Sequence, residues 1–225
     1  KIQNVFLNCY YNSSNTKNLY LELILNKKTD FSRYNYFYAS YANSSGKINE
    51  AKNIVQSALK LYPRNLLLNQ YKIDLKEEKK INAFDCRKES HVIAEILYIT
   101  ANALSQESIY SLSNFYLNLA KYLNEDFHSF NTLMAENFYK IDNFEKAKKI
   151  YKNLGKRGEA YNWYSDKQTA RILIQEKKKN KAIKLVRNIY NDLNNKNVYQ
   201  TYDFAEFLKN NEKFDESINY YTQII

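Results

Sequence analysis

Glycine and proline are scarce in this chain of 225 residues, which has only 3 Gly and 1 Pro. Globular proteins average about 7% Gly and about 5% Pro. β-Sandwiches, β-barrels and dinucleotide-binding sheets need many turns, and some need glycines that let the backbone approach phosphate groups. Because 44% of the residues are hydrophobic, the chain can still bury a sizeable core. The sequence therefore predicts an all-α protein.

Long apolar runs are absent as well, since no window approaches 18 consecutive apolar residues and the mean hydropathy is -0.67. No membrane-spanning helix is expected from such a pattern. The chain begins with Lys1 without a signal-peptide pattern, and its last helical pattern stops at Ile225. We therefore expect the sequence to be an internal piece of a longer protein.

Residue types that carry catalytic or metal-binding chemistry are few. Cys9 and Cys86 lie in unrelated contexts without zinc-site spacing, so the favoured interpretation is two free structural thiols. His91 and His128 are the only histidines, and no nucleophile or carboxylate is spaced with them as in a recognisable triad. Neither a His-Glu-x-x-His motif nor a glycine-rich phosphate loop occurs. The sequence predicts a non-enzyme with no catalytic residue, metal or cofactor.

Charge is unevenly distributed along the chain, whose formal net charge is +10. The basic stretch, residues 145–187, holds 14 Lys or Arg and 4 Asp or Glu, so it accounts for the whole excess. Heavy use of Asn, Lys, Tyr and Ile is expected of an A- and T-biased genome, which raises lysine content without selection for binding. The side chains of the resulting basic patch are Lys146, Lys149, Lys152, Lys156, Lys177, Lys178, Lys179, Lys181, Lys184 and Arg187.

Two helical patterns separated by a short turn recur along the chain. In residues 32–65 apolar residues fall at helical spacing on both sides of a Ser-Ser-Gly-Lys turn, small residues stand at Ala39, Ala51 and Ala58, and Pro63 closes the block. This block resembles the tetratricopeptide repeat, a 34-residue helix-turn-helix whose small residues let two helices approach closely. The same frame fits units near 94–127, 128–161, 163–196 and 198–225.

The predicted domain organisation follows from these units. Residues 1–78 form an N-terminal helical array, with a turn at Asn12–Asn15 and one helix over 65–78. Residues 79–90 lack a clear helical period and are expected to be a linker or an ordered loop. The sequence leaves open whether this segment is a hinge or a packed brace. Residues 91–225 form a C-terminal array. The resemblance implies an α-solenoid of antiparallel helix pairs wound into a right-handed superhelix.

A second resemblance covers the whole chain. The order of a repeat ending Tyr-Pro-Arg-Asn, a helix, an irregular stretch, Ala94–Tyr98 and Leu119–Asn124 is similar to the middle of long, mostly uncharacterised tetratricopeptide proteins of proteobacteria. These proteins tend to carry an export signal ahead of their repeats. The resemblance implies a location on the periplasmic side of the cell envelope.

The tetratricopeptide resemblance also implies a binding groove, because positions 2, 5, 9 and 12 of each unit line the concave face. Position 2 gives Arg33, Glu95 and Ser129 in the first three units. The residues that we predict to contact a partner are Tyr36, Tyr98, Asn102, Glu136, Tyr139, Tyr164, Lys167, Arg171, Tyr199, Tyr202 and Glu206. Tyrosines offer the large, rigid faces that binding surfaces favour. Some tetratricopeptide domains bind a chaperone C-terminus with Lys and Asn, but Asp203 replaces an Asn of that pattern.

The predicted function is a non-catalytic scaffold that binds a partner protein or an extended peptide along the concave face. One alternative is binding of nucleic acid or an anionic membrane surface through the basic stretch. Lysine outnumbers arginine there, which argues against base-specific readout. Another alternative is a homo-oligomeric spacer whose interface is the apolar helix pair ending at Ile225.

Overall fold

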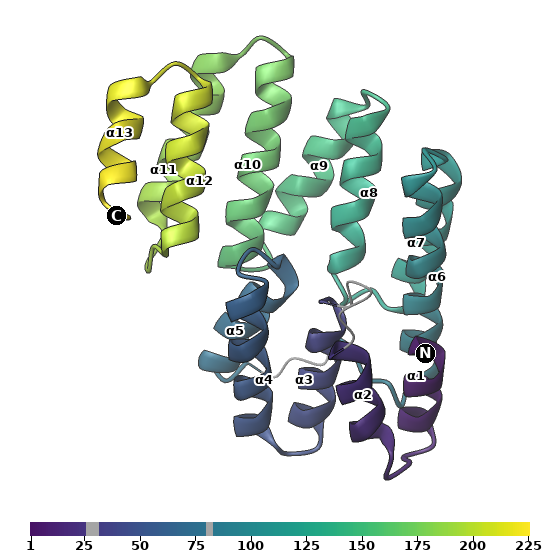
Figure 1. Cartoon of the computed structure of the whole chain (residues 1–225). Helices are drawn as coiled ribbons and strands as arrows, with labels where there is room; N and C mark the ends of the chain where they lie inside the picture. The colour runs from purple at the N-terminus through teal and green to yellow at the C-terminus, as the bar shows by residue number, and fades with distance from the viewer. Residues whose placement is uncertain (26–31, 80–82) are drawn as a thin grey trace. The chain divides into compact units, whose positions relative to one another are not determined.

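The computed structural model describes residues 1–25, 32–79 and 83–225, and within these residues it contains thirteen α-helices and no strand (Figure 1). The all-α prediction is confirmed. The chain divides into two compact units, 1–141 and 142–225. The first unit contains α1 (Ile2–Tyr10), α2 (Thr16–Ile24), α3 (Tyr34–Ser44), α4 (Ile48–Leu61), α5 (Leu66–Lys76), α6 (Glu89–Gln106), α7 (Tyr110–Leu123) and α8 (Ser129–Lys140). The second contains α9 (Phe144–Gly155), α10 (Glu159–Gln175), α11 (Lys179–Asp192), α12 (Val198–Asn210) and α13 (Phe214–Thr222).

The predicted units correspond to helix pairs. Residues 32–65 hold α3 and α4, 94–127 hold most of α6 and α7, 163–196 hold α10 and α11, and 198–225 hold α12 and α13. In each of these pairs the second helix packs directly against the first. The predicted unit 128–161 contains α8 and α9, and the boundary between the compact units lies inside it. The predicted division at 79–90 lies inside the first compact unit.

The turns between paired helices share one backbone conformation. The fifteenth residue of each unit has a positive φ: Gly46 (76°), Ser108 (62°), Asp142 (56°), Lys177 (59°) and Glu212 (64°). In four of these turns the next N–H donates to a carbonyl five residues earlier, as from Ile109 to Leu104 over 2.8 Å and from Lys178 to Leu173 over 2.8 Å. This geometry satisfies carbonyls at the end of the first helix and reverses the chain. The repeat is therefore present in the backbone as well as in the sequence.

Two positions of every unit hold small, buried residues. Position 8 is alanine in every unit and position 20 is alanine or serine, and all ten residues are at most 1% exposed. They are Ala39, Ala101, Ala135, Ala170 and Ala205 in the first helices, and Ala51, Ser113, Ala147, Ala182 and Ser217 in the second. The Ser113 hydroxyl donates to the Ala101 carbonyl (2.7 Å), and Ser217 donates to Ala205 (2.8 Å). Each serine thus avoids the cost of an unsatisfied buried hydroxyl.

Asparagine side chains cap the N-termini of helices α5, α9 and α12. The Asn65 side chain accepts from Leu68 N–H at the start of α5, and Asn143 accepts from Lys146 N–H at the start of α9. At α12, Asn197 accepts from Gln200 N–H and the Gln200 side chain accepts from Asn197 N–H, a reciprocal capping box. These bonds satisfy N–H groups that have no partner inside the helix.

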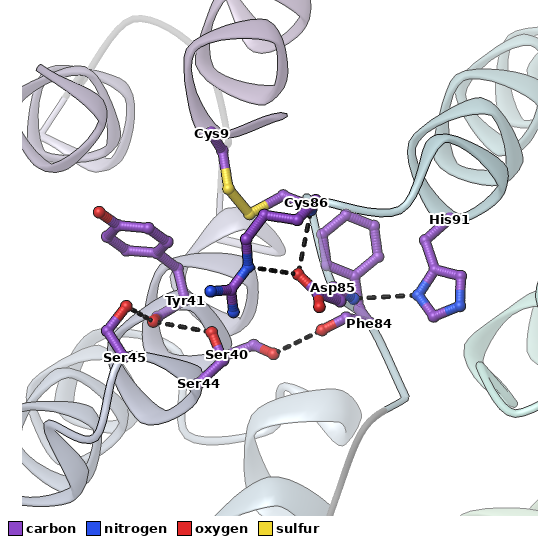
Figure 2. A network of polar contacts seen from close by, with 10 residues as sticks. Cys9, Ser40, Tyr41, Ser44, Ser45, Phe84, Asp85, Cys86 and His91 are labelled. Carbon is purple, nitrogen blue, oxygen red and sulfur yellow. Dashed lines mark hydrogen bonds and ion pairs between the residues drawn. A yellow bond between two sulfur atoms is a disulfide. The ribbon is translucent and has the colours of Figure 1, made fainter. Parts of the chain in front are cut away.

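Residues 83–88 of the predicted linker pack against helices of the first unit, and we call them the brace; residues 89 and 90 of the prediction begin α6. Residues 80–82 of the prediction lie outside the described residues. Phe84 is buried, with its ring 5.4 Å from Phe6 and 4.3 Å from Phe37 between centroids. The Ser40 hydroxyl donates to the Phe84 carbonyl over 2.9 Å (Figure 2). The brace therefore contributes Phe84 to the core of the first unit.

The prediction of two free thiols is wrong. Cys9 of α1 and Cys86 of the brace form a disulfide with a Cα–Cα distance of 5.8 Å, and both are buried (Figure 2). That distance lies in the usual range for disulfides. The two residues are 77 positions apart, so only the packing of the brace against the first unit brings them together.

His91 at the start of α6 contacts the brace. Its Nδ1 accepts a hydrogen bond from the Asp85 N–H (3.0 Å), and burial lowers the pKa of His91.

Among the described residues, no helix combines the length and apolarity needed to cross a membrane.

Candidate functional site

In the second unit, the residues predicted to line a groove are tyrosines and charged residues, and they lie on α10 and α12. Tyr199 and Tyr202 are each 41% exposed. The remaining predicted residues of this unit are half-buried: Tyr164, Lys167, Arg171 and Glu206. We call these six residues the first-helix face, because the repeat spacing places each on the first helix of its unit. Half-exposed tyrosines present a flat ring and a hydroxyl to a partner.

An ion pair links the two helices of this face. Lys167 Nζ on α10 lies 2.6 Å from Asp203 Oδ2 on α12, and the same ammonium lies 5.1 Å from the centroid of the Trp163 ring. Asp203 is the residue that breaks the chaperone-tail pattern in the sequence. A ligand carboxylate would have to compete with Asp203 for Lys167, so this pair does not favour a carboxylate clamp.

Glu206, three residues after Asp203 on α12, has two bonded partners. It accepts a 2.6 Å hydrogen bond from the Tyr221 hydroxyl and pairs with Lys209 Nζ at 2.9 Å. The hydrogen bond from Tyr221, together with Lys209, lowers the pKa of Glu206 below its ordinary value. Glu206 is therefore an ionised acceptor at neutral pH. The Tyr221 ring also packs edge-on against Tyr202, with 5.6 Å between centroids.

Tyr221 was not predicted as a site residue, and Lys209 is a predicted groove position that the set of expected partner contacts omits. Tyr221 lies on α13, the second helix of its unit, whereas the groove positions 2, 5, 9 and 12 all fall on first helices, so position within the repeat gave no reason to choose it. Lys209 stands at position 12, which the groove spacing does include. Its pairing with Glu206 follows the i, i+3 spacing of a helix and could have been read from the sequence.

Tyr36 is buried, contrary to the prediction of a groove position. It is 3% exposed, stacks on Phe127 (5.5 Å between centroids) and meets Tyr71 edge-on (4.8 Å). The reason is that α5, with Tyr71, packs against α3 and covers this face of the helix. The other predicted residues of the first unit are half-buried: Tyr98, Asn102, Glu136 and Tyr139.

Position 2 of the first three repeat units holds Arg33, Glu95 and Ser129. These residues form hydrogen bonds with one another instead of lining a groove. Both guanidinium nitrogens Nε and Nη2 of Arg33 bind the fully buried Glu95 carboxylate, at 2.7 and 2.8 Å. Arg33 Nη1 donates to the Ser129 hydroxyl over 2.7 Å, and its guanidinium lies 3.9 Å from the Tyr98 ring centroid. Burial raises the pKa of Glu95, and Arg33 opposes that shift. This cluster joins α6 and α8 to the residue preceding α3.

The basic patch is exposed but partly neutralised. Glu176 pairs with Lys148 (2.8 Å) and Lys178 (2.7 Å), and Arg187 pairs with Glu216 (2.6 Å). Lys179 also pairs with Glu212. Among the described residues of the patch, the exposed lysines for which no ion pair is seen are Lys149, Lys152, Lys156, Lys177, Lys181 and Lys184. No group of three or more His, Cys, Asp or Glu is placed to hold a metal ion among the described residues.

Comparison with known proteins finds a similarity in fold. Two crystal structures of a Podosopora anserina protein assigned as a kinesin light chain, with nearly identical TPR-like repeats, each match with a TM-score of 0.44 and 10% identity. The matches cover 85% of this chain and 92% of that chain in one case, and 87% and 95% in the other. No family profile and no curated protein matches this chain. The TPR-like assignment therefore depends on the repeated turns and small residues described above.

Proposed function

We propose that this protein is a non-catalytic scaffold that binds an extended segment of a partner protein along the first-helix face of the second unit. TPR-like helical repeats commonly mediate protein–protein interaction. The observation that carries the proposal is the arrangement of Tyr199 and Tyr202, both partly exposed, beside the ionised Glu206. The tyrosines supply contact area at low cost in conformational entropy, and Glu206 can accept from a partner N–H or cation.

A peptide-display selection tests this proposal. A library of random extended peptides is selected on the wild-type chain, and the enriched peptides are then measured against two variants. Tyr199→Ala/Tyr202→Ala removes both rings from the face, and we expect affinity to fall about 30-fold or more, as for interface hot spots. Lys181→Gln/Lys184→Gln changes exposed lysines of α11 and should leave affinity unchanged.

Circular dichroism tests whether both double variants keep the helical content of the wild type, which we expect because Tyr199 and Tyr202 are each 41% exposed. Retention of binding by the tyrosine variant at unchanged helicity would contradict the proposal. Failure to enrich any peptide on the wild-type chain would contradict it as well.

The basic stretch supports a second candidate, attraction to nucleic acid or an anionic membrane. Its support is the group of exposed lysines on α9 and α11 for which no ion pair is seen among the described residues. Binding of this kind falls steeply with salt, because each neutralised phosphate releases counterions. Duplex DNA and phosphatidylserine vesicles, titrated at low and high salt, would give that signature, and Lys181→Gln/Lys184→Gln would weaken it.

The Cys9–Cys86 disulfide supports an oxidising compartment as the site of action. Disulfides persist in the periplasm and outside the cell, and they are rare in the reducing cytosol. The periplasmic side of the cell envelope, expected from the resemblance, is one such compartment. Thiol trapping of the protein isolated from its native cells tests this: alkylation of both cysteines without prior reduction would contradict it.

A further inference from the structure

Helix α7 carries apolar side chains on two opposite faces. Its inner face buries Ser113, Leu117 and Ala120, and it packs against α6 (Figure 1). Its outer face carries four large side chains that are between 38% and 87% exposed. We call these four residues the α7 stripe: Leu112, Phe115, Leu119 and Tyr122.

The repeat itself shows that this outer face is unusual. The stripe occupies positions 19, 22, 26 and 29 of its unit, which are polar or charged in three other second helices. These positions hold Glu50, Asn53, Ser57 and Lys60 in α4, Lys146, Lys149 and Asn153 in α9 with Lys156 directly after it, and Lys181, Lys184, Asn188 and Asn191 in α11. The repeat architecture therefore does not require apolar residues here. Contiguous exposed apolar patches of this size commonly mark interaction sites.

The charge of α7 indicates what covers the stripe. Lys121 is the only charged residue in the helix. Helices that lie on a membrane surface carry many Lys or Arg on their polar face, and α7 does not. A charged peptide would find little complementary charge there. A second copy of the chain can pair through apolar side chains without complementary charge. Because each molecule has a net charge of +10, two copies repel each other least where the contacting surface is nearly neutral, as α7 is.

The spacing of the stripe fits an antiparallel pair of helices. The steps between its residues are three, four and three, which read the same in both directions and are centred on Leu117. A two-fold axis at that point would place Leu112 against Tyr122 of the partner subunit and Phe115 against Leu119 of the partner subunit. The four side chains expose on the order of 500 Å² per copy, so a pair would bury about 1,000 Å², the lower bound of a specific interface.

We propose that the α7 stripe is the interface of a homodimer with two antiparallel α7 helices at its centre. This surface differs from the last helix pair at Ile225, which the sequence suggested for self-association, and it is independent of the proposed first-helix face.

Sedimentation velocity of the oxidised full chain, from about 1 µM to about 200 µM, tests the proposal. We expect wild-type dimers and, for Phe115→Lys, a dissociation constant raised about 30-fold or more. Lys149→Gln changes the residue at the same position of α9 and should leave the dimer intact. A monomeric wild type throughout this range would overturn the proposal, and so would a Phe115→Lys variant that still dimerises.

Cross-linking then tests the orientation. Leu112→Cys and Tyr122→Cys chains are mixed and treated with a short bismaleimide. Antiparallel pairing predicts that the mixed dimer cross-links in preference to either self-dimer. Preferred self-cross-linking would overturn the antiparallel interface. A monomeric chain that floats with phosphatidylcholine vesicles, and loses this property on Phe115→Lys, would overturn the homodimer in favour of a membrane.

Discussion

Cys9 on α1 is bonded to Cys86 in the brace, so a covalent link crosses 77 residues of sequence and holds α1 beside the segment that leads into α6. Helices α1 and α2 have only nine residues each, and helices of that length are unstable by themselves in water. The disulfide, together with the contact of Phe6 on Phe84, therefore contributes much of what keeps α1 in place.

Removal of the disulfide should destabilise the protein by about 4 kcal/mol, because the denatured chain loses a closed loop of this length. The variant Cys9→Ala/Cys86→Ala leaves no buried polar atom behind. Urea denaturation followed by circular dichroism measures the loss, with the wild type compared in the presence and absence of a phosphine reductant. The reductant should have no effect on the double variant. An unchanged wild-type midpoint after full reduction would contradict this prediction.

The repeat was predictable because it depends on local signals, but the pairing of Cys9 with Cys86 was not. Small residues at positions 8 and 20 are visible in the sequence, and the structure buries all of them. The disulfide and the burial of Tyr36 depend on α5 and the brace packing against α3. These segments lie outside the 34-residue frame, so no period in the sequence indicates what they cover.

The positive φ at position 15 predicts opposite effects of glycine at two lysines. Lys177 is exposed with φ 59°, a conformation that costs residues other than glycine about 1 kcal/mol. Lys177→Gly should therefore raise the free energy of unfolding by about 1 kcal/mol. Lys184→Gly, inside α11, should lower it by about 1 kcal/mol. Urea denaturation of both variants measures the difference, and equal signs would contradict the assignment.

Gly46 provides the reverse test of the same turn. Its φ is 76°, and a Cβ added there would meet no atom within 4 Å. Any loss of stability in Gly46→Ala would therefore come from backbone strain alone. We expect the free energy of unfolding, measured by urea denaturation, to fall by about 1 kcal/mol. A stability equal to that of the wild type would show that the turn tolerates alanine by changing its conformation.

Asn137 distinguishes two serines that occupy the same repeat position. Its buried side chain donates to the Ser113 hydroxyl (2.8 Å) and to Asn114 Oδ1 (3.0 Å), and accepts from Ser105 (2.6 Å). Among the bonds observed in the described residues, the Ser217 hydroxyl makes only the one to the Ala205 carbonyl. We expect Ser113→Ala to cost about 1.5 kcal/mol and Ser217→Ala less than about 0.5 kcal/mol. Thermal or urea denaturation compares them, and equal losses would contradict a role for Asn137.

The candidate site was predictable only in part. Tyr199, Tyr202 and Glu206 could be chosen because position within the repeat places them on a first helix. The contact of Tyr221 with Glu206 depends on how α13 packs against α12, which the period does not specify. The α7 stripe, by contrast, could have been predicted from the sequence, because Phe115 stands at the repeat position that Lys149 occupies in the next unit.

The Arg33–Glu95 pair predicts a pH-dependent stability when Arg33 is removed. Burial raises the pKa of Glu95 and Arg33 opposes that shift, so Arg33→Met should raise this pKa further. A carboxyl group whose pKa is higher in the folded state binds more protons when folded, and stability then falls as pH rises through that pKa. The free energy of unfolding of Arg33→Met should therefore decrease from about pH 5 to about pH 8 more steeply than that of the wild type.

At about pH 8, we expect Arg33→Met to cost about 3 kcal/mol, because it leaves a buried carboxylate without its partner. The double variant Arg33→Met/Glu95→Leu removes the charge as well, and it should recover most of that stability and lose the steep pH dependence. Urea denaturation at several pH values measures all three chains. If the single and double variants have the same pH slope, Glu95 is not the titrating group, and the ion pair does not account for the stability of this cluster.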